Sequence, residues 1–134
     1  LRVSNLNVFD MIFMVCVFIF FHLPGNNGDS DSKHVDQSPA FIIKRTGESV
    51  EREIRCSHSI PSYQVILWYK QDEHKGLKLL GYLNLEYPSI EEDVKGKIDF
   101  KGDGRKQSSL TISDLALNDS AVYFCAARTD TGSE

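Results

Sequence analysis

Short runs of β-forming residues, bounded by Gly, Pro, Ser, Asn or Asp, recur along most of this 134-residue chain. Beyond the N-terminal part, no long stretch has the periodicity of an amphipathic helix. We predict strands at 41–44, 49–57, 65–71, 78–83, 97–101, 108–113 and 121–127. Such spacing of short strands is typical of an all-β sandwich or barrel, and the chain length suits one domain.

Alternation along these strands predicts the core, because successive side chains point to opposite faces of a sheet. The predicted inward faces are formed by Ile98 and Phe100, by Leu110 and Ile112, and by Tyr123 and Cys125. Between two of these strands, KGDGRK is predicted to be a hairpin turn in which Asp103 and Gly104 tolerate positive φ. The inward faces would pack together between two sheets.

The strand VILWYKQ is apolar or aromatic on both faces. If Ile66 and Trp68 point inward, Tyr69 and Gln71 point outward, and Phe124 of the last strand is a second outward aromatic residue. An outer face with these side chains is too apolar to be left in water without a purpose, so we predict a partner surface. The alternative is that a loop or a leader residue covers it.

Residues 11–21, MIFMVCVFIFF, form an uncharged apolar run about half as long as the ~20 residues that span a bilayer as a helix. The polar and small residues that follow, LPGNNGDSDS, are typical of the cleavage region of a secretory signal peptide. We predict that 1–28 comprise upstream residues and this leader, with the mature start between Gly28 and Lys33. Met11 is an alternative initiator, and a buried strand or helix is the alternative interpretation of the run.

Loss of the leader, which contains Cys16, would leave Cys56 and Cys125. An even number of cysteines in an exported chain indicates one disulfide. A bond closing a loop of about 70 residues would stabilise the fold by roughly 4 kcal/mol in the chain-entropy model. Two free buried thiols are the alternative.

The two cysteines frame a tryptophan at a recognisable spacing. Trp68 follows Cys56 by twelve residues, and DSAVYFC ends at Cys125. This pattern resembles that of variable-type immunoglobulin domains. The segments VDQSP, ILWYKQ, LKLLGYL and DSAVYFCAA are similar to the variable region of a T-cell receptor β-type chain. The resemblance implies a V-set domain over 33–127, which is a β-sandwich with Greek-key connections.

The resemblance implies roles for several framework residues. The run Asp119-x-Ala121-x-Tyr123 would carry a tyrosine corner, in which the Tyr123 hydroxyl bonds back to upstream backbone. Lys97 stands where the family commonly has Arg, and would pair with Asp119 less firmly than Arg's bidentate fork. The segment before Cys56 is about two residues longer than usual, so we expect a β-bulge that turns Arg52 outward.

The resemblance also implies two binding surfaces. The family positions that face a paired variable domain carry over to Tyr69, Gln71, Leu79 and Phe124. The antigen-contacting loops carry over to Ser59, Ile60, Pro61, Ser62, Tyr63 and Gln64, to Leu83, Asn84, Leu85, Glu86 and Tyr87, and to Ala127 and Arg128 onward. Residues 128–134 would be the start of the third loop or unspliced flank.

In this family a separate joining segment encodes the last strand, which carries a Phe-Gly-x-Gly motif. No such motif follows Cys125 in this sequence. The resemblance therefore implies a germline variable segment whose sandwich lacks the final G strand, and which is marginally stable alone because a sheet edge is unpaired.

As part of a complete receptor, the chain would pass through the secretory pathway to the plasma membrane. There it would pair with an α-like variable chain, bind peptide held by a histocompatibility (MHC) molecule, and associate with CD3-type signalling subunits. The alternative is a fragment of a non-rearranging innate immunoglobulin-type receptor or adhesion ectodomain.

Other functions find little support in the sequence. The net charge of −4 and the absence of a long basic run argue against nucleic-acid binding. The four histidines accompany no Ser or Cys in a catalytic pattern, so we predict no enzyme, cofactor or metal site. The trio Glu91, Glu92 and Asp93 is typical of a solvated loop. Asn118 begins a formal glycosylation sequon that overlaps the predicted tyrosine corner.

Overall fold

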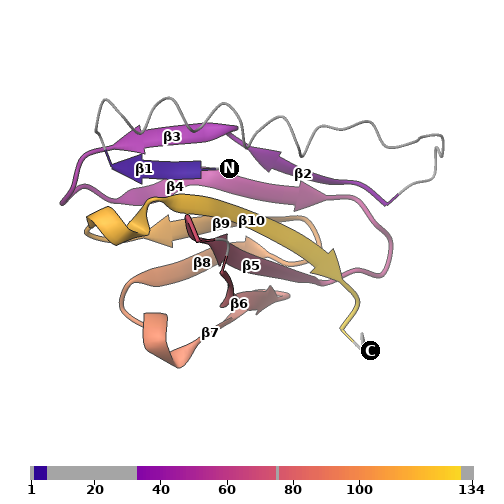
Figure 1. Ribbon diagram of the computed structural model, residues 1–134. Helices are drawn as coiled ribbons and strands as arrows, with labels where there is room; N and C mark the ends of the chain where they lie inside the picture. The colour runs from indigo at the N-terminus through magenta and orange to yellow at the C-terminus, as the bar shows by residue number, and fades with distance from the viewer. Residues whose placement is uncertain (1, 6–32, 75, 131–134) are drawn as a thin grey trace.

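The computed structural model describes residues 2–5, 33–74 and 76–130 (Figure 1). The strands are β1 (Arg2–Asn5), β2 (Val35–Ser38), β3 (Phe41–Lys44), β4 (Val50–His58), β5 (Val65–Gln71), β6 (Leu77–Asn84), β7 (Tyr87–Ile90), β8 (Ile98–Asp103), β9 (Gln107–Ile112) and β10 (Ala121–Arg128). The 3₁₀ turns are η2 (Glu92–Val94) and η3 (Leu117–Asp119). The apolar run at 11–21 lies outside the described residues, and the leader stays a prediction.

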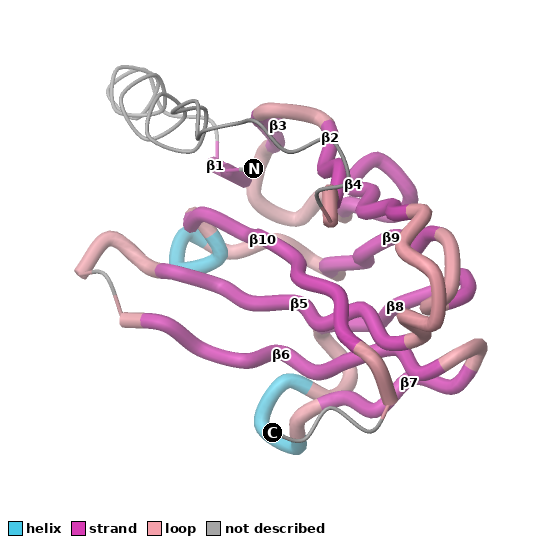
Figure 2. Tube along the Cα trace, turned by 90° about the vertical axis from the view of Figure 1, so that its right-hand side faces the viewer, coloured by secondary structure: helices cyan, strands magenta, loops and turns pink. Residues whose placement is uncertain are grey.

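The strands form two sheets that pack face to face. One sheet has the order β2-β4-β9-β8 and the other has the order β3-β1-β10-β5-β6-β7. In Figure 2, β10, β5 and β6 run side by side in the second sheet. The consecutive strands β4 and β5 belong to different sheets, as do β9 and β10, so the chain crosses between the layers. The predicted β-sandwich is confirmed, while the predicted absence of a final strand concerns residues beyond those described.

Three of the described strands, β1, β2 and β7, were not predicted from the sequence. β2 and β7 are short and contain polar or proline residues, so their sequences, VDQS and YPSI, have little β-pattern. β7 tolerates Pro88 because it lies at the edge of its sheet, where one side of the strand needs no ladder partner. β1 falls within residues 1–28, which we had assigned to upstream sequence and leader.

The predicted hairpin joins β8 to β9, but its conformation differs from the prediction. Asp103 is the last residue of β8, and positive φ occurs at Gly102, with a φ of 122°, rather than at Asp103 or Gly104. An alanine Cβ at 102 would lie 2.2 Å from the carbonyl oxygen of Gln107, so the backbone conformation and the close strand contact both favour glycine. The residue with positive φ is therefore Gly102, and not Asp103 or Gly104 as predicted.

The core lies between the sheets around Trp68, which is fully buried. Its indole Nε1 donates a 3.0 Å hydrogen bond to the hydroxyl of Ser108, which is also fully buried. This bond satisfies both polar groups inside an apolar environment. The predicted inward residues are buried as expected, with Cys125 only partly so: Ile98, Phe100, Leu110, Ile112, Tyr123 and Cys125.

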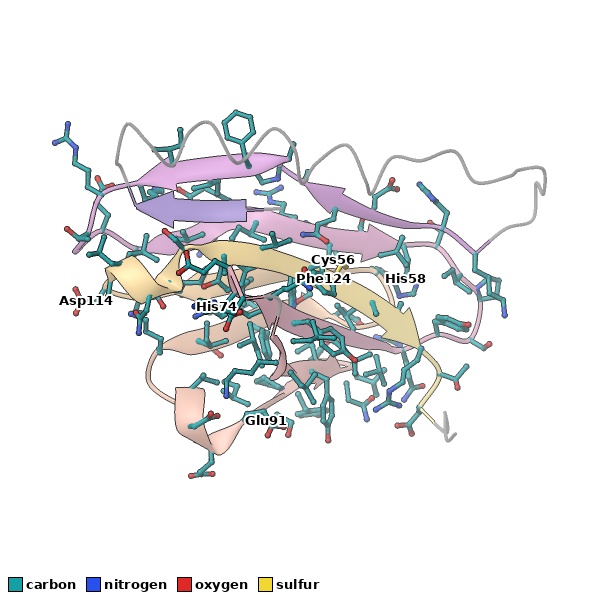
Figure 3. The ribbon with its side chains drawn as sticks, viewed as in Figure 1. Cys56, His58, His74, Glu91, Asp114 and Phe124 are labelled. Atoms are coloured by element: carbon teal, nitrogen blue, oxygen red, sulfur yellow. A yellow bond between two sulfur atoms is a disulfide. The ribbon has the colours of Figure 1, made fainter. Side chains whose placement is uncertain are left out.

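A disulfide joins Cys56 of β4 to Cys125 of β10 and so links the two sheets covalently. The Cα atoms are 6.4 Å apart and the cysteines are separated by 69 residues in sequence. In Figure 3, the label of Cys56 lies near the middle of β10, the strand that carries its partner Cys125. The alternative of two free thiols is thereby excluded.

The predicted bulge occurs in β4. The register between β4 and β9 shifts between Val50 and Ile54, both of which are fully buried. The residues between them, including Arg52, are all exposed. The two extra residues of β4 place Val50 and Ile54 inward without burying the guanidinium of Arg52, which confirms the predicted bulge.

The tyrosine corner is formed by two buried residues. The hydroxyl of Tyr123 donates a 2.7 Å hydrogen bond to the carbonyl oxygen of Asp119. Burial raises the pKa of this hydroxyl, and the nearby carboxylate of Asp119 raises it further. The group therefore stays protonated, as a hydrogen-bond donor must.

Lys97 and Asp119 form an ion pair with 2.7 Å between Nζ and Oδ2. The carboxylate of Asp119 also accepts a 2.7 Å bond from the N–H of Ala116, and the ammonium of Lys97 donates to the carbonyl of Asp114 at 2.8 Å. The Lys97 side chain is 32% exposed and that of Asp119 only 8%. Lys97 thus compensates a carboxylate that is largely removed from water.

We predict that replacing Cys56 and Cys125 by alanine together lowers the free energy of unfolding by about 4 kcal/mol, because the unfolded chain gains the freedom of the open loop. Denaturant titration under non-reducing conditions measures this loss. Cys16→Ala is the control, since that cysteine is outside the bonded pair. A loss below about 1 kcal/mol would contradict the role given to the bond.

We predict that Lys97→Met lowers the free energy of unfolding by about 1–3 kcal/mol, because it leaves the Asp119 carboxylate buried without its cation. Lys97→Arg should preserve or raise stability. Lys44→Met is the matched control: Lys44 forms a pair of equal length with Glu53, whose side chain is 45% exposed. Chemical unfolding of the three variants should show a smaller loss for Lys44→Met, and equal losses would refute the argument from burial.

Candidate binding surfaces

The outer face of the second sheet carries an aromatic row across three strands. Phe124 of β10 is paired with Tyr69 of β5, and Tyr69 is paired with Leu79 of β6. The rings of Tyr69 and Phe124 stack with their centroids 5.8 Å apart and an interplanar angle of 20°. All three side chains are half-buried in the isolated chain. This arrangement brings together three of the four predicted interface residues.

The fourth predicted interface residue, Gln71, lies two positions after Tyr69 and therefore on the same face of β5. It is half-buried and pairs with Leu77 of β6, which is 59% exposed. Its amide can both donate and accept hydrogen bonds. The face thus combines apolar area with one polar group that is able to orient a partner.

A bulge in β6 sets the composition of this face. The register shifts so that Trp68 pairs with Gly81 while Tyr69 pairs with Leu79, which leaves Leu80 as the extra residue. Leu80 is buried in the core, and an alanine Cβ at Gly81 would lie 2.3 Å from the carbonyl oxygen of Ser89. The bulge therefore turns an additional leucine inward and resets the alternation.

Beyond the bulge, the outer face continues in a second row. Tyr82 pairs with Leu67, and Leu67 pairs with Ala126. The guanidinium carbon of Arg128 lies 5.8 Å from the centroid of the Tyr82 ring, close enough for a cation–π interaction. The apolar face therefore extends along the sheet toward the end of β10.

The three predicted loops meet at that end of the sandwich. The side-chain amide of Gln64 donates to Asn84 at 3.1 Å, and the amide of Asn84 donates to the carboxylate of Asp130 at 3.1 Å. The backbone N–H of Gln64 also donates to the carbonyl of Arg128 at 3.2 Å. A hydrogen-bonded chain thus joins the first loop, the end of β6 and the segment after β10.

His58 anchors the first loop to the turn between β8 and β9. Its Nε2 donates a 2.8 Å bond to the carbonyl oxygen of Gly104, and its Nδ1 accepts a 3.1 Å bond from the N–H of Ile60. This pattern assigns the proton to Nε2. Figure 3 shows His58 near the end toward which β10 runs, whereas His74 lies toward the other end.

Gly104 is enclosed by main chain from two loops. Its N–H donates to the carbonyl of Leu85 at 2.8 Å, while its own carbonyl accepts from His58. A Cβ at this position would lie 2.1 Å from the carbonyl oxygen of Gln64 and 2.6 Å from that of Leu83. Only glycine allows this approach.

The first and second predicted loops differ in how well they match the structure. Residues 59–64 form a loop, and the Tyr63 ring contacts His58 edge-on with 6.2 Å between centroids. In the second loop, only Leu85 and Glu86 form the turn, and Tyr87 begins β7 with 72% exposure. Leu83 is fully buried within β6, so its predicted place in an antigen-contacting loop is wrong.

The third loop was predicted to start too early. Ala127 and Arg128 belong to β10, where they pair with Ile66 and Val65 of β5. Regular pairing continues because β5 begins at Val65 and offers ladder partners to the end of β10. The described part of this loop is therefore Thr129 and Asp130.

Two structural residues of this region were missed by sequence reasoning. Gln37 of β2 bridges to the other sheet: its side-chain amide donates to the carbonyl of Tyr123 at 2.7 Å and accepts from the N–H of Cys125 at 3.2 Å. The second is Gly104, whose partners come from distant segments. The only signal for Gln37 was its place in VDQSP, and Gly104 was predicted only as part of the hairpin turn.

Two members of the acidic trio at 91–93 form ion pairs. Asp93 pairs with Lys78, and Glu92 lies 3.2 Å from Lys95. The carboxylate of Asp103 accepts three bonds from the Arg105 guanidinium and one from the Arg105 backbone N–H, which lower the pKa of Asp103 to about 2. Among the described residues, no three His, Cys, Asp or Glu side chains gather in a way that could hold a metal ion.

Asn118 lies exposed in η3, where its carbonyl accepts a 2.9 Å bond from Lys70, and its glycosylation stays a prediction. Within residues 2–5, 33–74 and 76–130, no helix is long and apolar enough to cross a membrane.

Comparison with known proteins decides the family. The immunoglobulin V-set domain matches residues 37–134. Human T cell receptor beta variable 3-1 is 31% identical over 114 residues, covering 85% of this chain and 95% of the relative. The chain belongs to the immunoglobulin V-set family, as a T-cell receptor β-like variable region.

Other V-set relatives agree. Human T cell receptor beta variable 9 is 34% identical over 118 residues, covering 85% of this chain and 95% of its own. Human T cell receptor alpha variable 23/delta variable 6 is 34% identical over 100 residues, covering 73% of this chain and 78% of its own. This V-set chain is thus an antigen-receptor variable domain.

A solved structure also shares the fold of this V-set chain. It comes from work titled "Structural basis of T cell specificity and activation by the bacterial superantigen toxic shock syndrome toxin-1". The TM-score is 0.68 at 27% identity, covering 77% of this chain and 87% of the other. The likeness spans most of both chains.

We predict that Gly104→Ala lowers the free energy of unfolding by about 1–3 kcal/mol and shifts the backbone NMR signals of residues 59–64 and 83–86, because the added methyl group would strike main-chain atoms. Gly76→Ala is the matched control, since a Cβ there meets only the Asp72 side chain at 3.4 Å. If both variants shift the loop signals equally, the anchoring role of Gly104 is wrong.

Proposed function

We propose that the outer face of β10, β5 and β6 binds a second receptor variable domain, of the α-like type. The observation that carries this proposal is the aligned row of Phe124, Tyr69 and Leu79, all half-buried, on the outer face of the sheet. Aromatic residues at the centre of a face with a polar rim are typical of protein interfaces. When a partner covers half-buried rings, the rest of their apolar surface leaves water, and this burial stabilises the complex.

The polar groups around the row support a specific rather than a general apolar contact. Gln71 lies beside it with an amide that can donate and accept, and Arg128 carries a charge at the far end of the face. Such groups penalise wrong partners when left unpaired. The apolar area supplies affinity, and the polar groups set register.

We further propose that the loop end contacts a peptide held by an MHC molecule. Tyr63 and the strongly exposed Tyr87 offer amphipathic rings with few rotatable bonds, which form contacts at low entropic cost. The links between Gln64, Asn84 and Asp130 hold the loops together before binding, which reduces the cost of ordering them.

The proposed setting is the complete receptor at the plasma membrane, reached through the secretory pathway. CD3-type signalling subunits would contact parts of the receptor outside this domain. The inter-sheet disulfide supports an exported protein, because such bonds persist in oxidising compartments.

We predict that Phe124→Asp weakens binding to a T-cell receptor α variable domain by about 30-fold or more, because it places a charge at the centre of the buried face. Titration calorimetry or sedimentation with the purified domains measures the dissociation constant. Leu117→Asp is the matched control, since Leu117 is 69% exposed in η3, away from the outer face. Equal loss in both variants, or no binding by the unaltered chain, would overturn the proposal.

A further inference from the structure

The strand β1 is inserted between β3 and β10 in the second sheet. Arg2 and Val3 pair antiparallel with Val122 and Ala121 of β10. On its other side, β1 pairs parallel with all of β3, from Phe41 to Lys44. In Figure 1, β1, drawn in indigo, lies alongside β3. We call the space bounded by Phe41–Lys44 and Ala121–Arg128 the acceptor slot.

The acceptor slot is filled by β1 through main-chain pairing. Among the described strands, β3 pairs with β1 alone, so β1 is what attaches β3 to this sheet. Because β1 has a neighbour on each side, each of its N–H groups points toward one neighbour or the other. Backbone pairing of this kind tolerates many sequences, as in other cases of strand addition to a sheet edge.

β1 covers only part of the β10 edge. It pairs with two of the eight residues of β10. Further along, the Gln37 side chain supplies bonds to Tyr123 and Cys125 in place of a strand. The edge of β10 is therefore satisfied by two separate groups, and a longer strand would offer a more continuous ladder.

The topology fixes what else could fill the slot. A strand that returns from the end of β10 through a hairpin must run antiparallel to β10. The other side of β10 is taken by β5, so such a strand has to enter the slot in the direction that β1 already follows. β1 and a return strand cannot both be there.

We propose that the acceptor slot is a strand-binding site and that Arg2–Asn5 occupy it as an internal, displaceable ligand, in competition with a strand that returns from β10. The proposal rests on the sheet topology and not on the proposed pairing with another variable domain. Its consequence is that processing controls the slot. Cleavage at the predicted site between Gly28 and Lys33 removes β1 and opens the slot to a return strand.

The first test is Val3→Pro in the full chain, with Val3→Ala as the matched control that keeps the N–H. Proline removes the N–H and thereby one bond of the ladder. Amide hydrogen exchange at Ile42 and Ile43 should become at least about tenfold faster in Val3→Pro and change little in Val3→Ala. Unchanged exchange in Val3→Pro would overturn the assignment of β1 to the slot.

The second test extends the full chain beyond Glu134 by a hairpin loop and an alternating Val/Thr strand. We expect exchange at Val3 and Ser4 to rise at least about tenfold while Ile42 and Ile43 stay protected. A control extension has proline at alternate strand positions and should leave Val3 protected. Persistent protection of Val3 with the strand extension would refute competition. If the protection of Val3 depends on chain concentration, the strand in the slot comes from another copy of the chain, which would refute the internal ligand.

Discussion

The rest of the sandwich depends on the covalent link between β4 and β10. Cys56 and Cys125 bring the central strands of the two sheets together, and Trp68 is fully buried in the core between them. A domain of this size buries a limited apolar area, so a cross-link worth about 4 kcal/mol is a large part of its net stability. Both binding surfaces use strands that this link positions.

β10 makes different contacts on each of its two faces and two edges. Inward, Tyr123 and Cys125 form the corner and the disulfide. Outward, Phe124 stacks on Tyr69. One edge pairs with β5, and the other accepts β1 and Gln37. The strict alternation of a strand separates these roles, so one sequence of eight residues can satisfy all of them.

Local pattern revealed the framework well. Alternation identified the buried faces around Phe100 and Leu110, and the spacing of Cys56, Trp68 and Cys125 indicated the family. The outward aromatic row was also found, because Phe124 and Tyr69 break the usual polar outer face. The buried faces and the aromatic row are encoded in the alternation within single strands, and the spacing of the two cysteines and Trp68 is a linear pattern, so both kinds of feature are visible in the sequence.

The features that sequence reasoning missed depend on distant segments. Leu83 was assigned to a loop because nothing local shows that the β6 bulge turns this part of the strand into the core. Gly104 touches the carbonyl oxygens of Gln64 and Leu83, which are far away in sequence. β1 was assigned to upstream sequence because a four-residue strand has little signal of its own. Each depends on a tertiary contact that overrides local preference.

The chain of bonds through Gln64, Asn84 and Asp130 has a consequence for how such a domain varies. If the segment after β10 differs from one receptor molecule to another, the partner of Asn84 differs with it, and Asn84 holds Gln64. Diversity introduced at one junction would then spread through shared polar contacts to loops whose own sequence is fixed. The repertoire of surface shapes would exceed the number of sequences in any single loop taken alone.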